Sequence, residues 1–163
     1  MTEFLFKTNP YQHQLEALES SHDKEEFALF MEMGCGKSKV VIDNFVHLYR
    51  EQKINGVLIL APKGVYDTWY SKEIPNHVPD EINYHSVKWS NANTQKNKKL
   101  LATLSEEPER LNILIMNIEA LSTKKGTQFV TDFLFKRKSM FIIDESTTIK
   151  NHKAKRTINA VRL

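Results

Sequence analysis

A glycine-rich stretch near the amino terminus combines residue types that can hold the phosphate groups of a nucleotide. Its sequence is Met31-Glu32-Met33-Gly34-Cys35-Gly36-Lys37-Ser38. Gly34 and Gly36 permit a tight turn whose backbone N–H groups approach phosphate oxygens without a Cβ atom in the way. In such a loop Lys37 reaches the β- and γ-phosphates, and the Ser38 hydroxyl group binds Mg²⁺. We therefore expect a phosphate-binding loop at this point of the chain.

Two features of this loop leave alternatives open. Met31 stands where the general pattern has its first glycine, and the remaining Gly-x-Gly-Lys-Ser also occurs in ordinary tight turns. The alternative is a strand-to-helix turn with an exposed lysine, against which the flanking strand and helix patterns argue. Cys35 lies near an expected helix N-terminus, where the pKa of a thiol can fall. It is either a redox-sensitive group or, as we favour, a small residue at a tolerant position.

Asp144 and Glu145 form a second cluster, directly after the apolar run Met140–Ile143. An aspartate at the carboxyl end of a buried strand can hold Mg²⁺ directly or through a water molecule. The adjacent glutamate can orient an attacking water or take its proton. The alternative is an acidic pair that caps the next helix. We expect both acids to face Lys37 and Ser38 across one pocket for Mg²⁺ and a nucleotide.

Short apolar runs alternate with longer amphipathic segments along the chain. The runs, which we interpret as buried strands, are Phe27–Met31, Val57–Ala61, Ile113–Met116, Met140–Ile143 and the weaker Tyr84–Val87. Apolar residues at helical spacing predict three helices, marked by Val41, Phe45, Leu48 and Tyr49, by Leu100, Leu101 and Leu104, and by Phe129, Phe133 and Leu134. This alternation predicts an α/β fold with a parallel sheet between two helical layers. Right-handed crossovers place the loops after the strands at one edge, where a ligand should bind.

Composition and charge set the broad class of the protein. The chain has 163 residues, of which 40% are apolar and 26% charged, as in one soluble globular domain. No run approaches the roughly 18 apolar residues of a membrane span, and the first residues lack the apolar region of a secretory signal. The single cysteine excludes an internal disulfide and suits a reducing cytosol, so we expect a cytoplasmic protein. The net charge of +3 permits a polyanionic partner without demonstrating one.

The motifs together resemble the first RecA-like lobe of superfamily-two helicases, nearest the Swi/Snf-type DNA translocases and their viral and bacterial relatives. Pro10–Leu18 resembles the Q motif, whose glutamine reads the adenine edge, and Gln14 fits that role best, with Gln12 second. Met31–Ser38 resembles motif I, which in this family often has Glu-Met-Gly before the second glycine. Asp144-Glu145-Ser146-Thr147 stands where the family has Asp-Glu-x-His, and Thr147 replaces the histidine.

Other segments resemble the parts of this family that touch nucleic acid. Leu60–Lys63, continuing to Trp69, resembles motif Ia, and Asn117–Leu121 resembles the region near motif Ib. Because such motors track a phosphate backbone, we expect contacts from Lys63, Gly64, Trp69, Asn117 and Lys150. The alternatives are a core anchor on a helix for Trp69, a solvated loop lysine for Lys63 and a basic helix face around Lys150.

The resemblance implies a RecA-like P-loop NTPase lobe over residues 1–163, with ATP and Mg²⁺ as ligands. Lys37 and Glu145 would be catalytic, Ser38 and Asp144 would hold Mg²⁺, and the ATP-binding set would be Gln14, Gly34, Cys35, Gly36, Lys37 and Ser38. The partner would be DNA, with RNA as the alternative. In the family a strand carrying motif III and a second lobe with arginine fingers come later, so we expect an incomplete motor with little or no ATP turnover alone.

Two other functions remain open from the sequence. One is a P-loop NTPase that is not a motor, such as a small kinase or a nucleotide switch, and the Q-motif-like start argues against it. The other is a regulatory or assembly module that binds a nucleotide. For a viral protein the expected compartment is the host-cell cytoplasm.

Overall fold

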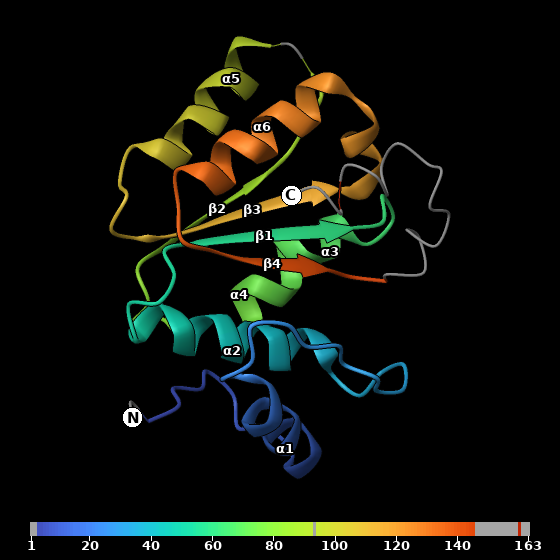
Figure 1. Cartoon of the computed structure of the whole chain (residues 1–163), viewed down its shortest axis with the longest axis vertical. Helices are drawn as coiled ribbons and strands as arrows, with labels where there is room; N and C mark the ends of the chain where they lie inside the picture. Colours follow the sequence, from blue (N-terminus) through green and yellow to red (C-terminus); the bar gives the residue numbers. More distant parts are fainter. Residues whose placement is uncertain (1–2, 93, 146–159, 161–163) are drawn as a thin grey trace.

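A parallel sheet of four strands forms the centre of the molecule in the computed structural model, which describes residues 3–92, 94–145 and 160 (Figure 1). The strands are β1 (Gly56–Ala61), β2 (Tyr84–Lys88), β3 (Leu111–Asn117) and β4 (Ser139–Ile143), and their order is β2-β3-β1-β4. All three pairings are parallel, and Leu58 of β1 is level with Leu114 of β3 and Phe141 of β4. The carboxyl ends of the strands therefore share one edge.

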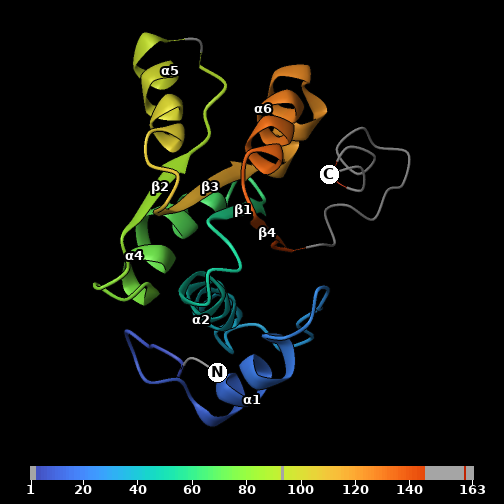
Figure 2. The same ribbon diagram turned by 60° about the vertical axis from the view of Figure 1, so that its left-hand side comes forward.

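Helices cover both faces of this sheet. The helical segments are α1 (Gln12–Ser21), α2 (Lys37–Arg50), α3 (Tyr66–Thr68), the π-helical turn η1 (Trp69–Glu73), α4 (Ile74–His77), α5 (Gln95–Ala102), η2 (Thr103–Ser105), η3 (Ile118–Ser122) and α6 (Lys124–Phe135). Figure 1 shows α5 and α6 on one face and α2 with α4 on the other, while α1 lies outside α2, and Figure 2 shows the same layers from another side. The expected three-layer α/β fold is confirmed.

The two faces of the sheet carry separate hydrophobic cores. Val57, Ile59 and Ala61 of β1 belong to the core under α2, whereas Leu58 and Leu60 belong to the core under α6. This alternation follows from the two-residue period of a strand. All five side chains are fully buried, and complete burial of one leucine or isoleucine stabilises the fold by roughly 1.5–3 kcal/mol.

The sheet confirms four of the five expected strands and excludes the first. Residues 27–32 form no strand, and Phe27 and Phe30 are 52% and 97% exposed. The prediction of a buried strand at Phe27–Met31 is therefore wrong for this structure. The three helices predicted from apolar spacing are present as α2, α5 and α6.

The physical reason for this difference is that a strand needs a neighbouring strand for its backbone hydrogen bonds. β1 pairs with one edge of β4, and no strand among the described residues pairs with the other edge. In the family that the sequence resembles, a strand carrying motif III lies between the acidic strand and the phosphate-loop strand. No such strand is among the residues that the structure describes, and Phe27–Met31 has no neighbouring strand there, although its apolar sequence is suited to a sheet.

No helix in the described part of the chain is long and apolar enough to cross a membrane.

Candidate nucleotide site at the carboxyl edge of the sheet

The glycine-rich loop leads directly into α2, as its sequence predicts. Gly34 and Gly36 have φ angles of 81° and 75°, a left-handed conformation that residues with a Cβ atom rarely adopt. Gly36 is the N-cap of α2, and Lys37 is the first residue of the helix. A Cβ atom on Gly36 would also lie 2.3 Å from Gln14 Nε2. The left-handed backbone conformation therefore requires glycine at position 36, and a methyl group there would also displace the end of the Gln14 side chain.

Helix α1 contacts the loop through Gln14, which is 5% exposed. Gln14 Nε2 donates a hydrogen bond of 3.2 Å to the Cys35 carbonyl oxygen, and its Oε1 accepts one of 3.0 Å from Tyr11 N. His13 Nε2 lies 3.1 Å from the same Cys35 oxygen. The structure thus brings the Q-motif-like segment against the loop. The sequence did not predict this contact of His13, because a histidine beside the expected glutamine carries no signal of its own.

The side chain of Lys37 turns back onto its own loop. Its Nζ donates hydrogen bonds to the carbonyl oxygens of Met31 and Glu32, at 3.0 and 2.9 Å. An incoming phosphate group would exchange these neutral acceptors for charged ones, which form stronger hydrogen bonds. Ser38 follows in the first turn of α2 and is half-buried.

The acidic pair begins where β4 ends. Asp144 N donates a hydrogen bond of 2.8 Å to Leu60 O, which extends the pairing of β4 with β1 by one residue. Asp144 Oδ2 accepts a hydrogen bond of 2.7 Å from the indole Nε1 of Trp69. Glu145 is exposed and has a φ of 52°, which is uncommon for a residue with a Cβ atom and marks a sharp turn after the strand.

The two clusters lie on the same side of the sheet. In Figure 1 the arrowheads of β1 and β4 and the start of α2 all lie toward the right of the molecule. The hydrogen bonds of Lys37 go to its own loop and that of the Asp144 carboxylate goes to Trp69, so these contacts do not join the clusters.

The oxygen donors at this edge fit Mg²⁺ held chiefly by a nucleotide. The Ser38 hydroxyl and the Asp144 carboxylate are hard ligands of the kind that Mg²⁺ prefers. The described residues contain no group of three or more His, Cys, Asp or Glu side chains that could hold a metal by themselves. Mg²⁺ is usually bound through one or two protein oxygens together with substrate phosphates, and this edge supplies such a set.

The residues expected to touch nucleic acid have different positions. Lys63 and Gly64 are exposed in the loop after β1, and Asn117 ends β3 and donates a hydrogen bond of 3.3 Å to Glu119 Oε2. Trp69 is 2% exposed and belongs to the core under α2. A ring so deeply buried cannot stack on a base or lie against a phosphate, so the expected contact of Trp69 is corrected to the alternative of a core anchor. Lys150 lies outside the described residues.

A buried ion pair on α2 was not expected from the sequence. Lys39 Nζ and Asp43 Oδ2 are 2.7 Å apart, and their side chains are 7% and 2% exposed. Burial raises the pKa of Asp43 to about 6, although the hydrogen bond from Lys39 acts in the opposite direction. Lys39 and Asp43 have the four-residue spacing of a helical ion pair, and such pairs are usually exposed. The sequence therefore allows the pair but does not show that it is buried.

Comparison with known proteins agrees with the α/β fold. A family model described as SNF2-related domain matches residues 11–163. Among solved structures, the chain is similar to the Sulfolobus solfataricus SWI2/SNF2 ATPase core in complex with dsDNA, with a TM-score of 0.70 and 17% sequence identity. The match covers 100% of this chain and 31% of that one, so the chain spans about a third of that protein's length. The likeness shows the RecA-like α/β fold. No curated protein matches the chain.

Proposed function

Because the chain belongs to the SNF2-related domain family, we propose that it is the ATP-binding lobe of a motor ATPase that moves along DNA. One observation carries this proposal: a loop with two left-handed glycines leads into α2 on the side of the sheet where Asp144 follows the end of β4. A helix N-terminus and a carboxylate on the same side of the sheet suit the phosphates and the metal ion of Mg²⁺-ATP.

Each residue of this edge has a role in the proposed reaction. The loop N–H groups and Lys37 hold the β- and γ-phosphates, and Ser38 and Asp144 hold Mg²⁺. Mg²⁺, when bound, neutralises charge on the phosphate oxygens. Glu145, exposed at the turn after β4, orients the attacking water and takes its proton. Gln14, whose amide group contacts the loop at Cys35, reads the edge of the adenine.

The proposed DNA contacts lie in loops at the same edge. Lys63 and Gly64 follow β1 and Asn117 follows β3, and these strands are neighbours in the sheet. Their side chains and N–H groups suit a phosphate backbone that is followed without base readout. The structure from Sulfolobus solfataricus is of a complex with dsDNA, which favours DNA over RNA as the partner.

A complete motor needs a second RecA-like lobe that supplies arginine fingers. An arginine finger typically contributes roughly 10³–10⁵ in rate, so we infer that this lobe alone hydrolyses ATP slowly or not at all. We also propose a cytoplasmic location. A P-loop NTPase that is not a motor would bind ATP with the same loop but would not respond to DNA.

The nucleotide assignment is tested by titrating the chain with Mg²⁺-ATP in a calorimeter. We expect Lys37→Ala to weaken binding by at least roughly tenfold, since it removes a charge-assisted contact to phosphate. Lys72→Ala, which changes an exposed lysine in η1, is the matched control and should bind as the unaltered chain does. Equal binding by Lys37→Ala and the control would contradict the assignment.

The motor assignment is tested by DNA binding and by ATP turnover. Duplex DNA followed by fluorescence anisotropy should bind more weakly as salt rises, because backbone contacts release counterions. Lys63→Ala should reduce the slope of log K against log salt concentration by about one, which corresponds to the loss of one phosphate contact. A version extended by a second RecA-like lobe should hydrolyse ATP faster when DNA is added, and ATPase activity indifferent to DNA would favour the non-motor alternative.

A further inference from the structure

A cavity of about 460 Å³ lies between α5 and α6, on the face of the sheet opposite to α2. Residues from α5, η2 and α6 line it, together with Trp89 directly after β2. Its volume is within the range of roughly 300–1,000 Å³ that is typical of pockets for small molecules. Figure 1 shows α5 and α6, which line the cavity, on the opposite face of the sheet from α2, which the glycine-rich loop precedes.

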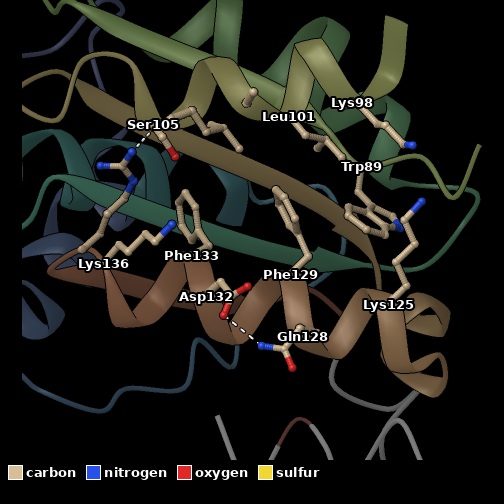
Figure 3. A pocket seen from close by; sticks show the side chains of 13 residues that line it. Trp89, Lys98, Leu101, Ser105, Lys125, Gln128, Phe129, Asp132, Phe133 and Lys136 are labelled. Atoms are coloured by element: carbon tan, nitrogen blue, oxygen red, sulfur yellow. Dashed lines mark hydrogen bonds between the residues drawn. The ribbon is translucent and has the colours of Figure 1, made fainter. Parts of the chain in front are cut away.

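The floor of this cavity is aromatic and aliphatic. Figure 3 shows Phe129 and Phe133 reaching from α6 toward α5, and Leu101 reaching from α5 toward them. Trp89 closes one end, and its ring centroid is 5.0 Å from that of Phe129. Trp89 is 1% exposed, and its buried Nε1 has no hydrogen-bond acceptor among the described residues. The floor can therefore accept a flat or branched apolar group.

The rim of the cavity is strongly basic. Four cationic side chains line the cavity, namely Lys98, Lys125, Lys136 and Arg137. Its one acidic lining residue, Asp132, accepts a hydrogen bond of 2.9 Å from Gln128. Four positive charges and one negative charge leave the lining with a formal charge of +3. Within the described part of the chain, no carboxylate forms an ion pair with the three lysines.

Two of these cations lie against the aromatic floor. Lys125 Nζ is 5.7 Å from the centroid of the Trp89 ring, and Arg137 Cζ is 5.6 Å from that of Phe133. Arg137 also donates a hydrogen bond to the Leu104 carbonyl oxygen. Burial, with a smaller contribution from the nearby charge of Arg110, lowers the pKa of Arg137.

From this combination we propose that the cavity binds a small amphipathic anion, with an aromatic or branched apolar body and one sulfonate, carboxylate or phosphate group. The apolar body lies on Phe129, Phe133 and Leu101, and the anionic group lies beside Lys98 and Lys125, at the end of the cavity that Trp89 closes (Figure 3). A nucleic-acid backbone fits this site less well, because its sugars and phosphates offer no apolar group for the floor. None of the residues that line this cavity belongs to the glycine-rich loop.

The two tryptophans of the chain allow a direct test by NMR spectroscopy. Naphthalene-2-sulfonate is titrated into the ¹⁵N-labelled chain, and the two indole N–H signals are assigned with Trp89→Phe. We expect a saturable shift of the Trp89 signal and little change at Trp69, whose indole is bound to Asp144 on the other face. The neutral analogue 2-naphthalenemethanol should bind more weakly by at least roughly threefold, since it lacks the charge.

Matched lysine variants separate the proposed site from general attraction to a basic surface. Lys98→Gln with Lys125→Gln should weaken naphthalene-2-sulfonate roughly three- to thirtyfold, the effect of two partly exposed charge contacts. Lys99→Gln with Lys124→Gln changes the adjacent exposed lysines of the same helices, which do not line the cavity, and should leave binding unchanged. The proposal is overturned if the Trp89 signal does not shift, if both indoles shift alike, or if both variant pairs weaken binding equally.

Discussion

The indole Nε1 of Trp69 donates a hydrogen bond of 2.7 Å to Asp144 Oδ2, although the two residues are 75 positions apart in the sequence. Trp69 is buried at the start of η1, and Asp144 directly follows β4. The bond therefore joins the segment after β1, where we propose DNA contacts, to the carboxylate that we propose for Mg²⁺. A displacement of one segment would therefore move the other or break this hydrogen bond.

Replacing Trp69 by phenylalanine tests the strength of this link. Trp69→Phe keeps a ring in the core but removes the donor, and we expect the free energy of unfolding to fall by about 1–3 kcal/mol. Asp144→Asn weakens the same bond from the other side. In a double-mutant cycle measured by urea denaturation, the two changes should be non-additive by at least about 0.5 kcal/mol. Strictly additive losses would mean that the bond contributes nothing to stability.

Gly36 is the position in the loop where a single methyl group should have the largest effect. Gly36→Ala meets both a φ of 75° and a contact of 2.3 Å with Gln14 Nε2. We expect a loss of about 1–3 kcal/mol in thermal or urea unfolding, together with weaker binding of Mg²⁺-ATP. Gly64→Ala has open space and no left-handed φ, so it should change stability by less than about 0.5 kcal/mol. Equal effects of the two substitutions would contradict the proposed strain.

Much of the fold follows from local sequence patterns. The continuous apolar runs at Val57–Ala61 and Ile113–Met116 predict central strands, and these strands are β1 and β3 in the structure. The loop from Gly34 to Gly36 is predicted because only glycine adopts its backbone conformation without strain. Such features depend on a few neighbouring residues, and the sequence displays them directly.

The features that the sequence did not predict depend on distant neighbours. Phe27–Met31 has the composition of a strand, but whether it forms one depends on a partner strand elsewhere in the chain. Trp69 has the position of a motif Ia contact, but the core under α2 buries it and Asp144 takes its hydrogen bond. Neither outcome can be read from the residues adjacent in sequence.

The buried pair of Lys39 and Asp43 should show a clear difference between breaking and replacing an ion pair. Asp43→Ala leaves the ammonium group of Lys39 buried without its partner, and we expect a loss of about 3–5 kcal/mol in urea denaturation. Lys39→Met combined with Asp43→Leu removes both charges and fills similar volume, so the double variant should be more stable than Asp43→Ala. A double variant less stable than Asp43→Ala would contradict this expectation, and its stability relative to the unaltered chain measures the net contribution of the pair.

The free energy of unfolding should also depend on pH, because two buried groups, His47 and Asp43, change it in opposite directions as the pH falls. Burial lowers the pKa of His47 below its ordinary value of 6.5, so below pH 6.5 the unfolded chain binds a proton that the folded chain resists. The stabilising contribution of neutral His47 is therefore fully present above pH 6.5, and it is lost as the pH falls through the lowered pKa of the folded state. Burial raises the pKa of Asp43 from 3.8 to about 6, so between these values the folded state binds more protons, and this contribution decreases as the pH rises.

Two variants separate these contributions in urea denaturation curves measured from pH 4 to pH 8. With His47→Gln, the loss of stability between pH 6.5 and pH 5 should be smaller than in the unaltered chain, because the group that resists protonation is gone. With Asp43→Asn, stability should fall more steeply as the pH decreases from about 6 to 4, because proton uptake by the folded state no longer opposes the fall. A pH profile of Asp43→Asn parallel to that of the unaltered chain would mean that this carboxyl group has the same pKa in the folded and unfolded states.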